Sequence, residues 1–240
     1  MAATIVVGDL HGKVEIAEYW IKNKEHRNLI FIGDYLDSFD RNIQDQQELL
    51  EIVLDAAENM ENVHALMGNH ELSYLDENYR ASGFKFALDA NIMHLKSKMR
   101  MLLRYYLIDN GFLISHAGFS RSFMGTEFGR APQSRKLELI EEAISKLSKD
   151  QLFQIGYGRG GNAKCGGPLW CDWYDEFQDI SNLRQVVGHT ARRKQGDNSG
   201  IVRKGGSVLI DCLDRKNEVL WISHGKARKK GFELPRKIIV

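Results

Sequence analysis

Short runs of apolar and β-branched residues recur along this chain, and five of them are followed at once by glycine, aspartate, asparagine or histidine. The runs are TIVV at 4–7, LIFI at 29–32, VHALM at 63–67, FLI at 112–114 and VV at 186–187. Short apolar runs bounded by turn-forming residues predict strands that are buried in a sheet. Each of the five motifs is therefore expected in a loop that follows a strand.

Between these runs, apolar residues return every three or four positions, which predicts helices. The first two helices would connect parallel strands in βαβ units and cover the sheet. Later in the chain, three apolar runs separated by turn formers predict an antiparallel meander. The expected helices are 14–21, 43–57, 71–78, 88–106 and 137–147, with a loop insertion at 119–134, and the expected meander strands are 201–204, 207–211 and 218–222.

Length and composition limit the broad class of protein. The 240 residues most simply form one domain over 1–225, followed by a basic tail at 226–240 that we interpret as a solvated terminus. The formal net charge of +1 gives no reason to expect specific nucleic-acid binding. No apolar run approaches the roughly 20 residues that span a bilayer, and no signal peptide is seen, so a soluble, cytoplasmic protein without membrane contact is expected. Cys165, Cys171 and Cys212 lack a close metal-type spacing and are expected to be reduced thiols.

The loops after the five strands hold side chains that bind metals. They are GDLHG at 8–12, GDYLD at 33–37, GNHE at 68–71, SHAG at 115–118 and GHT at 188–190. Loops that follow parallel strands meet at one edge of a sheet. Their carboxylate, amide and imidazole groups, without any thiolate, suit Mn, Fe or Zn. Six such groups are too many for one open catalytic ion and predict two ions that share a carboxylate and act on a phosphoester. The six are Asp9, His11, Asp34, Asn69, His116 and His189.

In order and type, these motifs resemble those of the calcineurin-like metallophosphoesterases, and among them the phosphoprotein phosphatase group of bacterial or bacteriophage type. The resemblance implies an α/β fold, a four-layer α/β/β/α sandwich of two mixed β-sheets flanked by helices. It also implies that Asp9 and His11 bind one metal ion, that Asp34 bridges, and that the second ion is bound by Asn69, His116 and His189. His70 would be the general acid, oriented by Asp37. Two divalent ions, most simply Mn²⁺ with Fe or Zn as alternatives, would generate a bridging hydroxide that attacks phosphorus.

One position departs from the resemblance, because Ser38 stands where a phosphate-binding arginine is expected. A guanidinium suits two phosphate oxygens at once, so another arginine should reach the site. Arg159, in the glycine-rich stretch 156–167, and Arg41 are the candidates, in competition with Arg121 and Arg184. The formal GxGxxG in that stretch lacks the strand and helix of a dinucleotide site. The segment LWCDWYD at 169–175 extends the resemblance and aligns Asp172 with a carboxylate of the phosphatases.

The resemblance favours a serine/threonine protein phosphatase of broad specificity, whose substrate is a phosphorylated protein or a small phosphoester. Hydrolysis of diadenosine polyphosphates, which are nucleotide substrates, is an open alternative within the same superfamily. A metal-binding regulatory module without catalysis is a second alternative, and the loss of arginine at Ser38 is the feature that favours it. The presence of both His70 and Asp37 favours an enzyme.

Overall fold

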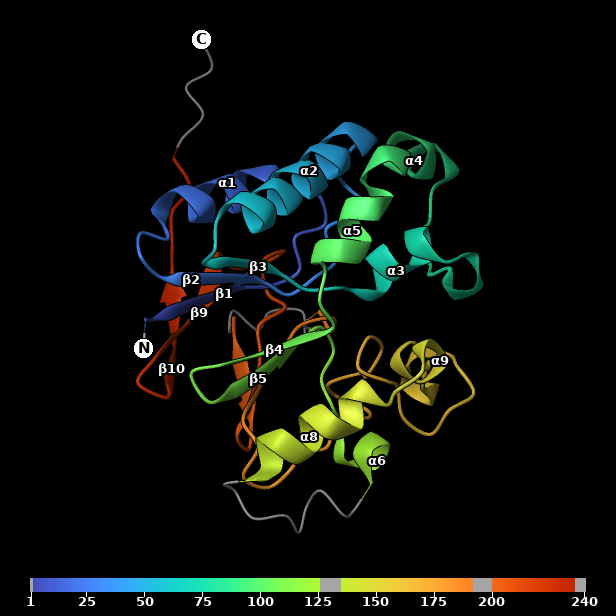
Figure 1. Cartoon of the computed structure of the whole chain (residues 1–240), viewed down its shortest axis with the longest axis vertical. Coiled ribbons are helices and arrows are strands. Elements are labelled where there is room, and N and C mark those ends of the chain that lie inside the picture. The colour runs from blue at the N-terminus through green and yellow to red at the C-terminus, as the bar shows by residue number, and fades with distance from the viewer. Residues whose placement is uncertain (1, 126–134, 192–199, 236–240) are drawn as a thin grey trace.

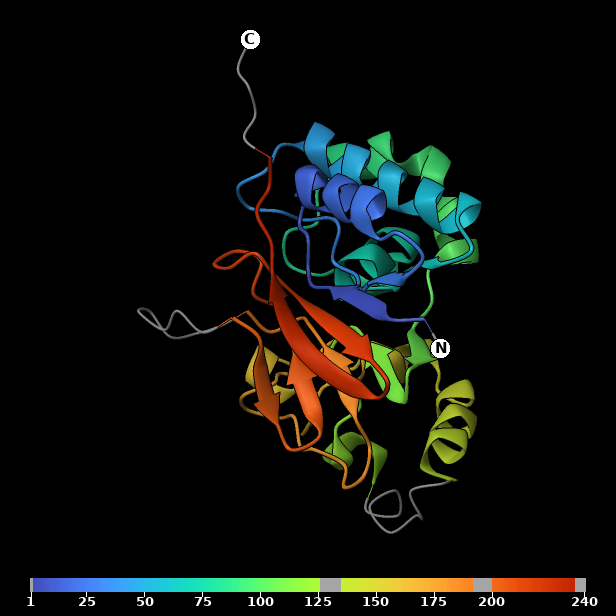
Figure 2. The same cartoon turned by 90° about the vertical axis from the view of Figure 1, so that its left-hand side faces the viewer.

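A computed structural model describes residues 2–125, 135–191 and 200–235. Two five-stranded sheets pack face to face, and helices cover the outer face of each (Figures 1 and 2). Both sheets contain parallel and antiparallel pairs, so the predicted α/β/β/α sandwich of two mixed sheets is confirmed.

The first sheet has the strand order β10-β9-β1-β2-β3, in which β1, β2 and β3 are parallel and β9 is antiparallel to both of its neighbours, β1 and β10. The predicted helices α1 (Val14–Asn23) and α2 (Ile43–Asn59) link the parallel strands and cover the outer face (Figure 1). The strands are β1 (Thr4–Val7), β2 (Asn28–Phe31), β3 (Val63–Ala65), β9 (Glu218–Ser223) and β10 (Lys226–Gly231).

The second sheet has the order β4-β5-β6-β8-β7, with β5, β6 and β8 parallel and the two edge strands antiparallel. On its outer side lie α6 (Arg121–Met124) and α8 (Lys136–Ser145), and α9 (Lys149–Leu152) follows α8 along the chain (Figure 1). The strands are β4 (Tyr106–Asp109), β5 (Phe112–Ser115), β6 (Gln185–Val187), β7 (Val202–Lys204) and β8 (Ser207–Leu209).

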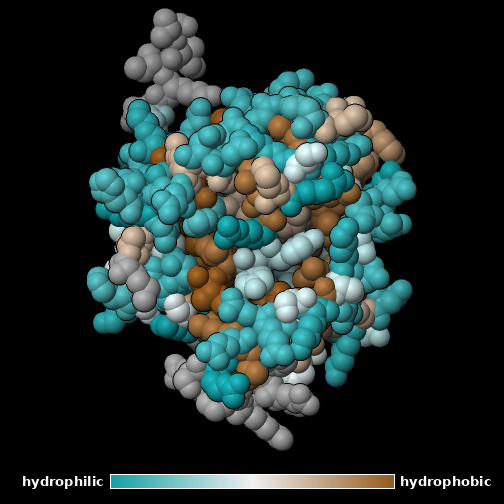
Figure 3. Space-filling view, viewed as in Figure 1, coloured by the Kyte–Doolittle hydropathy of each residue, from teal (hydrophilic) through white to brown (hydrophobic). Residues whose placement is uncertain are grey.

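The core has separate layers because alternate residues of a strand point to opposite faces. In β1, Ile5 and Val7 pack under the helices, whereas Val6 faces the second sheet. In β2, Leu29 likewise packs under the helices, whereas Ile30 faces the second sheet. The central strands are therefore apolar at nearly every position, which is the pattern that the sequence shows. On the face drawn in Figure 3, hydrophobic side chains are seen between the outer layers.

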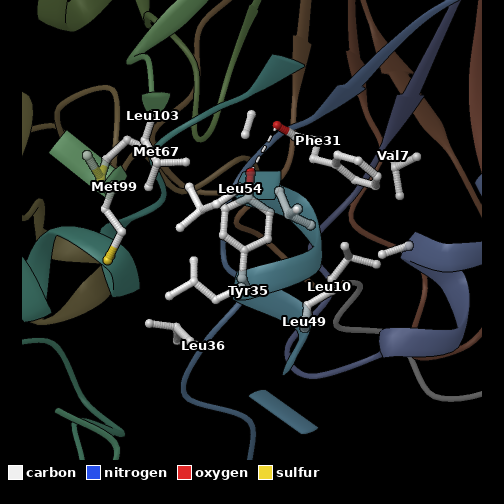
Figure 4. Packing of buried hydrophobic residues seen from close by; sticks show 14 of the residues in the cluster. Val7, Leu10, Phe31, Tyr35, Leu36, Leu49, Leu54, Met67, Met99 and Leu103 are labelled. Atoms are coloured by element: carbon white, nitrogen blue, oxygen red, sulfur yellow. Dashed lines mark hydrogen bonds between the residues drawn. The ribbon is translucent and has the colours of Figure 1, made fainter. Parts of the chain in front are cut away.

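Tyr35 anchors the second motif loop in the layer below the helices. Its ring is fully buried among aliphatic side chains, and its hydroxyl donates to the Phe31 carbonyl oxygen at 3.3 Å (Figure 4). The Leu66 carbonyl oxygen lies 3.0 Å from the same hydroxyl. Because Tyr35 follows Asp34 directly, this packing holds the aspartate at the end of β2.

The predicted helix over 88–106 is wrong in its extent. The chain forms α4 (Phe86–Asn91), a 3₁₀ turn η2 (Met93–Leu95) and α5 (Lys96–Leu102), and then enters β4. Ile92, Leu95 and Met99 are still buried, so the apolar spacing correctly marks the buried face. It cannot detect the bend, because a 3₁₀ turn keeps nearly the same spacing.

Other local predictions are partly confirmed. The helix after GNHE begins two residues early, as α3 (Asn69–Leu75), and a 3₁₀ turn η1 (Glu77–Tyr79) follows. The glycine-rich stretch holds the 3₁₀ turn η4 (Tyr157–Arg159) and opens no helix, so its GxGxxG does not form the dinucleotide fingerprint of a βαβ unit. Of the loop insertion expected at 119–134, the residues 126–134 lie outside the described ranges.

The predicted meander and tail both need correction. Strands β7 and β8 form an antiparallel hairpin, but β9 crosses to the first sheet and pairs with β1. The first six residues of the expected solvated tail form β10, an edge strand on β9. Ala227 packs against the layer between the sheets, and the Lys230 ammonium lies 4.4 Å from the Trp221 ring centroid. A lysine-rich run suits an edge strand, because charge there prevents pairing with other chains.

The five motif loops all follow strands whose carboxyl ends lie at one edge of their sheet, as predicted. No helix in the parts of the chain that the structure describes is long and apolar enough to cross a lipid bilayer.

Candidate metal centre

Six side chains from the five loops meet where the edges of the two sheets face each other. Asp34 Oδ2 lies 3.3 Å from His116 Nε2 and 3.8 Å from His11 Nε2. Asn69 Oδ1 lies 3.0 Å from His116 Nε2 and 3.0 Å from His189 Nδ1. The sixth is Asp9, whose Oδ2 accepts a hydrogen bond from the backbone of His189 at 2.9 Å. The structure thus brings together all the residues that the sequence predicts as metal ligands.

These side chains form two groups that share one residue. In each group, the ligand atoms lie within 4.8 Å of one another. The first group is Asp9, His11 and Asp34, and the second is Asp34, His116 and His189. This geometry allows two cation sites with Asp34 between them.

The hydrogen bonds of the histidines direct lone pairs into the centre. His11 Nδ1 lies 2.7 Å from the Leu36 carbonyl oxygen and His116 Nδ1 lies 3.0 Å from that of Ile32. Each Nδ1 therefore carries the proton, and each Nε2 offers a lone pair. Asp9 Oδ1 is buried without a hydrogen-bond partner among the described residues. Converging buried lone pairs are unfavourable unless a cation binds them, so these residues fit two divalent metal ions.

The electrostatics of the centre also favour cations. Burial raises the pKa of Asp9, and the charges of Asp211 and Asp34 raise it further. Burial raises the pKa of Asp211 to about 7, with further increases from Asp214 and Asp34. At Asp34, burial raises the pKa, and the positive charge that His116 and His70 carry when no cation is bound lowers it well below the usual range. Crowded carboxylates of this kind are stabilised by bound metal ions.

The backbone at the centre adopts a conformation that side chains rarely tolerate. The φ angles are 41° at His11, 55° at Asp34 and 68° at His189, all in the left-handed region. Such strain persists only where the surrounding structure enforces it, and it is concentrated at functional sites. Gly188 is required for close packing, because a Cβ there would lie 2.1 Å from Asp9 Oδ1.

Glu71 is a residue whose role the sequence did not reveal. It is fully buried, and its carboxylate accepts hydrogen bonds from the backbone N–H groups of two motif loops. The donors are Asp34 and Tyr35, both at 2.8 Å, Gly68 at 3.0 Å and Leu36 at 3.3 Å. The glutamate of GNHE therefore fixes the loop of Asp34 against the start of α3.

His70 and Asp37 form a pair beside the centre. His70 Nδ1 lies 2.8 Å from Asp37 Oδ2, and its Nε2 lies 3.9 Å from Asp34 Oδ2. The Tyr74 hydroxyl donates to the other oxygen of Asp37. Burial lowers the pKa of His70, but Asp34 and Asp37 outweigh this effect and raise it to about 9. The two carboxylates therefore favour the protonated imidazole, whose Nε2 is directed at the centre.

The candidate arginines lie in different places. Arg159 lines the cavity over the centre, where its Nε lies 2.9 Å from Asp172 and its Nη2 donates to Thr190 Oγ1 at 3.1 Å. Arg41 pairs with Glu15 at 2.6 Å and lines a different cavity, beside α1. Arg121 donates to the Gln178 side chain, and Arg184 donates to the Gly225 carbonyl. Within the described ranges, Arg159 is thus the one candidate arginine in this cavity.

The cavity has a volume of about 430 Å³, and some of its walls were not predicted. Asp211, which follows β8, and Asp214 line it, and the buried Lys13 reaches Asp214 at 2.5 Å. Like the predicted ligands, Asp211 follows a strand, and this strand, β8, is parallel to β6. That placement is the sequence signal that could have identified it. Ser38 and Asp40 also line the cavity, and the Ser38 hydroxyl donates to Asp40 at 2.6 Å, so it supplies no positive charge in place of the missing arginine.

The comparison with protein families agrees with this geometry. A profile of the calcineurin-like phosphoesterases matches residues 3–193, and the chain belongs to this family. Its members are dinuclear metal-dependent enzymes, and this protein is a metal-dependent phosphatase whose Asp and His cluster is the candidate metal site. Among curated protein sequences, none matches this chain significantly.

Solved structures with the same fold include the cold-active protein-tyrosine phosphatase of a psychrophilic Shewanella species. It is 15% identical with a TM-score of 0.59, over 95% of this chain and 80% of that one. A further structure of a cold-active protein tyrosine phosphatase has 16% identity and a TM-score of 0.58, over 95% and 78% of the two chains. A metallophosphoesterase from Sphaerobacter thermophilus has 13% identity and a TM-score of 0.47, over 98% and 89%. At these identities, the first two similarities establish the fold.

Proposed function

We propose that this metal-dependent phosphatase hydrolyses phosphoserine and phosphothreonine esters in proteins, with two Mn²⁺ ions as its cofactors. The observation that carries the proposal is the pair of ligand groups that share Asp34. Asp9 and His11 would hold one ion, Asn69, His116 and His189 the other, and Asp34 both. Oxygen and imidazole donors without thiolate suit Mn²⁺, and Fe or Zn share that preference. When bound, two such ions activate water and offset charge on a phosphoryl group.

His70 is proposed as the proton donor to the leaving oxygen. Its Nδ1 forms a hydrogen bond with Asp37 Oδ2 at 2.8 Å, so the proton on Nε2 is the one directed towards the cavity. Burial lowers the pKa of His70, and the hydrogen bond and charge of Asp37 act against it, which favours the protonated form that a general acid requires. Asp37 acts through His70 and is a positioning residue.

Arg159 is proposed to bind the phosphoryl oxygens in place of the arginine that is missing at position 38. Its contact with the fully buried Asp172 fixes the guanidinium at the wall of the cavity, with its side chain 27% exposed. A fixed, charged fork loses little entropy when it binds an anion. The ion pair of Arg41 with Glu15, away from this cavity, makes Arg41 the weaker candidate.

The shape of the site favours a protein substrate. The cavity is open to the surface, and a side chain that projects from a polypeptide can enter it. Phe39, at its rim, is 90% exposed and offers an apolar surface to residues beside the phosphate. The same ring could stack on a nucleobase, which is the observation that favours the second candidate function, hydrolysis of diadenosine polyphosphates.

Two substitutions test the assignment of the centre. Asp34→Asn should abolish hydrolysis of p-nitrophenyl phosphate and reduce bound Mn²⁺, measured by elemental mass spectrometry. His70→Asn should leave metal content near normal and slow esters with poor leaving groups most. His94→Asn is the matched control, because His94 is exposed and pairs with Glu51 on the surface. Turnover by Asp34→Asn at the wild-type rate would contradict the proposal.

The substrate class requires a direct comparison. Phosphoserine, phosphothreonine and phosphotyrosine peptides, diadenosine tetraphosphate and cyclic nucleotides should be assayed side by side with Mn²⁺. We expect the highest kcat/KM for the phosphoserine or phosphothreonine peptides. Highest kcat/KM for diadenosine tetraphosphate, with loss of that preference in Phe39→Ala, would instead establish the nucleotide function. Repeating the assay with Fe²⁺ and Zn²⁺ tests the choice of metal.

A further inference from the structure

Two buried cysteines lie in contact outside the metal centre. The Sγ atoms of Cys165 and Cys171 are 4.0 Å apart, and none of the three cysteines forms a disulfide. Cys165 belongs to the glycine-rich stretch at 156–167, and Cys171 belongs to LWCDWYD at 169–175. We propose that Cys165 and Cys171 are a peroxide-reactive pair that forms a reversible disulfide and thereby controls the catalytic centre.

The two thiols have different access to solvent. Cys165 lines a cavity of about 270 Å³ whose walls include Phe123 of α6, Ala143 of α8 and Gln154. Cys165 is 3% exposed, whereas Cys171 is fully buried and does not line this cavity. A small oxidant such as hydrogen peroxide can therefore reach Cys165 first, and Cys171 is placed to react with the product. A thiolate that a small oxidant can reach, next to a second, resolving cysteine, is the usual arrangement of a redox-sensitive site.

The surroundings also favour thiolate character at Cys165. Its hydrogen bond with Cys171 lowers the pKa of the Cys165 thiol against the effect of burial, and a hydrogen bond with Ser120 lowers it further. The same contact and burial raise the pKa of Cys171. Because the thiolate is the reactive form, Cys165 is the nucleophile of the pair.

The chemistry needs only peroxide as oxidant. The Cys165 thiolate attacks one peroxide oxygen, so that an S–O bond forms, the O–O bond breaks and hydroxide leaves, to be protonated to water. Cys171 then loses its proton and attacks the Cys165 sulfur, which forms the S–S bond and releases the second oxygen as water. The two sulfurs together lose two electrons, which the peroxide gains.

A metal ion is a weaker interpretation of the same cluster. Cys165, Cys171 and Glu176 have ligand atoms within 4.8 Å of one another. The Glu176 carboxylate, however, already accepts hydrogen bonds from the backbone of Gly158 at 2.7 Å and of Gly166 at 2.8 Å. It is therefore committed to holding the loop, and two thiols alone do not make a stable metal site.

The position of the pair gives the disulfide a route to the catalytic centre. Trp170 precedes Cys171, and its ring centroid lies 5.3 Å from that of His189. Asp172 follows Cys171 and holds Arg159 at 2.9 Å. Because an S–S bond is about 2.05 Å long, the sulfurs must approach by roughly 2 Å. We expect this movement to displace Trp170 and Asp172, an effect on turnover that rests on the proposed function.

The test uses the full, metal-loaded chain treated with hydrogen peroxide. Wild type should lose two hydrogen atoms in mass, and peptide mapping after alkylation should join Cys165 to Cys171. Cys171→Ser should stop at a sulfenic acid on Cys165 that dimedone traps, and Cys165→Ser should leave Cys171 reduced. Cys212→Ser is the matched control and should form the disulfide as wild type does, because the Cys212 thiol lies 3.7 Å from the Glu218 carbonyl, apart from the pair. Three alkylatable thiols in peroxide-treated wild type would overturn the site.

Activity measurements test the control of the centre separately. The disulfide should lower kcat/KM by roughly 10-fold to 100-fold, since a displacement of about 1 Å can have that effect, and dithiothreitol should restore it. Cys165→Ser should keep its activity in peroxide. An equal loss in Cys165→Ser would show that peroxide acts on the metal ions, and would overturn control by the disulfide. Because the disulfide is read by mass, its test stands even where the proposed substrate class fails.

Discussion

Replacing Asp37 by asparagine tests the proton donor, because it removes one charge and leaves His70 in place. Asp37 Oδ2 lies 2.8 Å from His70 Nδ1, and its other oxygen accepts from the Tyr74 hydroxyl. Asparagine preserves the shape and one acceptor oxygen. It cannot stabilise the imidazolium by charge, so the pKa of His70 should fall.

The structure sets the size of this effect. The carboxylates of Asp34 and Asp37 outweigh burial and raise the pKa of His70 from 6.5 to about 9. That difference corresponds to roughly 3 kcal/mol of preference for the charged imidazole. Asp34 contributes as well, so removing the Asp37 charge should lower the pKa of His70 by about 1 to 2 pH units.

The sign of the stability effect follows from the same pKa. A histidine with a raised pKa in the folded state stabilises the protein fully below pH 6.5, and this contribution is lost as the pH rises through 9. Metal-free wild type should therefore lose folding free energy over this range, and Asp37→Asn should lose less of it. Urea unfolding at pH 6.5 and pH 9 measures the difference.

Two further assays follow His70 itself. Proton NMR of the metal-free protein, with His70→Asn to assign the resonance, gives the pKa directly. In the metal-loaded enzyme, the basic limb of the profile of kcat against pH, for an ester with a poor leaving group, should move to lower pH in Asp37→Asn. Glu51→Gln, which neutralises a carboxylate beside the exposed His94, should change neither measurement. An unchanged His70 titration in Asp37→Asn would refute the reasoning.

Three other predictions follow from contacts at the site. In steady-state kinetics, Arg159→Ala should raise KM for phosphoesters by roughly 10-fold to 100-fold, as expected for the loss of a charge-assisted hydrogen bond. Arg41→Ala should leave KM unchanged. Gly188→Ala should weaken Mn²⁺ binding in calorimetry, because its Cβ would lie 2.1 Å from Asp9 Oδ1. In urea unfolding, Glu71→Ala should lower the free energy of unfolding by about 3 kcal/mol or more, since it leaves four buried N–H donors unpaired. Glu77→Ala, at an exposed position, should have little effect on the same quantity.

The motif loops could be predicted because their signals are local. A buried strand needs a continuous apolar run, and the sharp turn after it needs glycine or a residue that tolerates a left-handed backbone. Both signals occur within about ten residues, as in TIVVGDLHG. Loops at the ends of parallel strands meet at one edge of the sheet, and no further sequence signal is needed to predict this. The six predicted ligands therefore lie together.

The failures have a different cause, because they depend on distant parts of the chain. The run at 218–222 predicts a strand, but only the open edge of β1 decides that it joins the first sheet. Asp211 lacks an adjacent glycine or histidine, so its place beside Asp9 becomes evident only once β8 is paired with β6. Glu71 has an ordinary helical position in sequence, and its role depends on N–H groups 35 to 37 residues away.

The metal centre lies on the interface between the two sheets, which predicts that metal binding and sheet packing are coupled. The first sheet supplies Asp9 and Asp34, the second supplies His116 and His189, and a hydrogen bond from the His189 backbone to Asp9 at 2.9 Å joins them. Ions bound across an interface stabilise it by mass action, and loosening it must weaken their binding.

Neighbouring residues of β2 offer a matched test of this coupling. Ile30 and Leu29 are both fully buried, but Ile30 packs between the sheets and Leu29 packs under the helices. Alanine at either position should lower the free energy of unfolding by about 2 to 5 kcal/mol. Only Ile30→Ala should also weaken Mn²⁺ binding, measured by calorimetry at a temperature where both variants are folded. Equal weakening in Leu29→Ala would mean that the centre responds to general stability and not to the packing of the sheets.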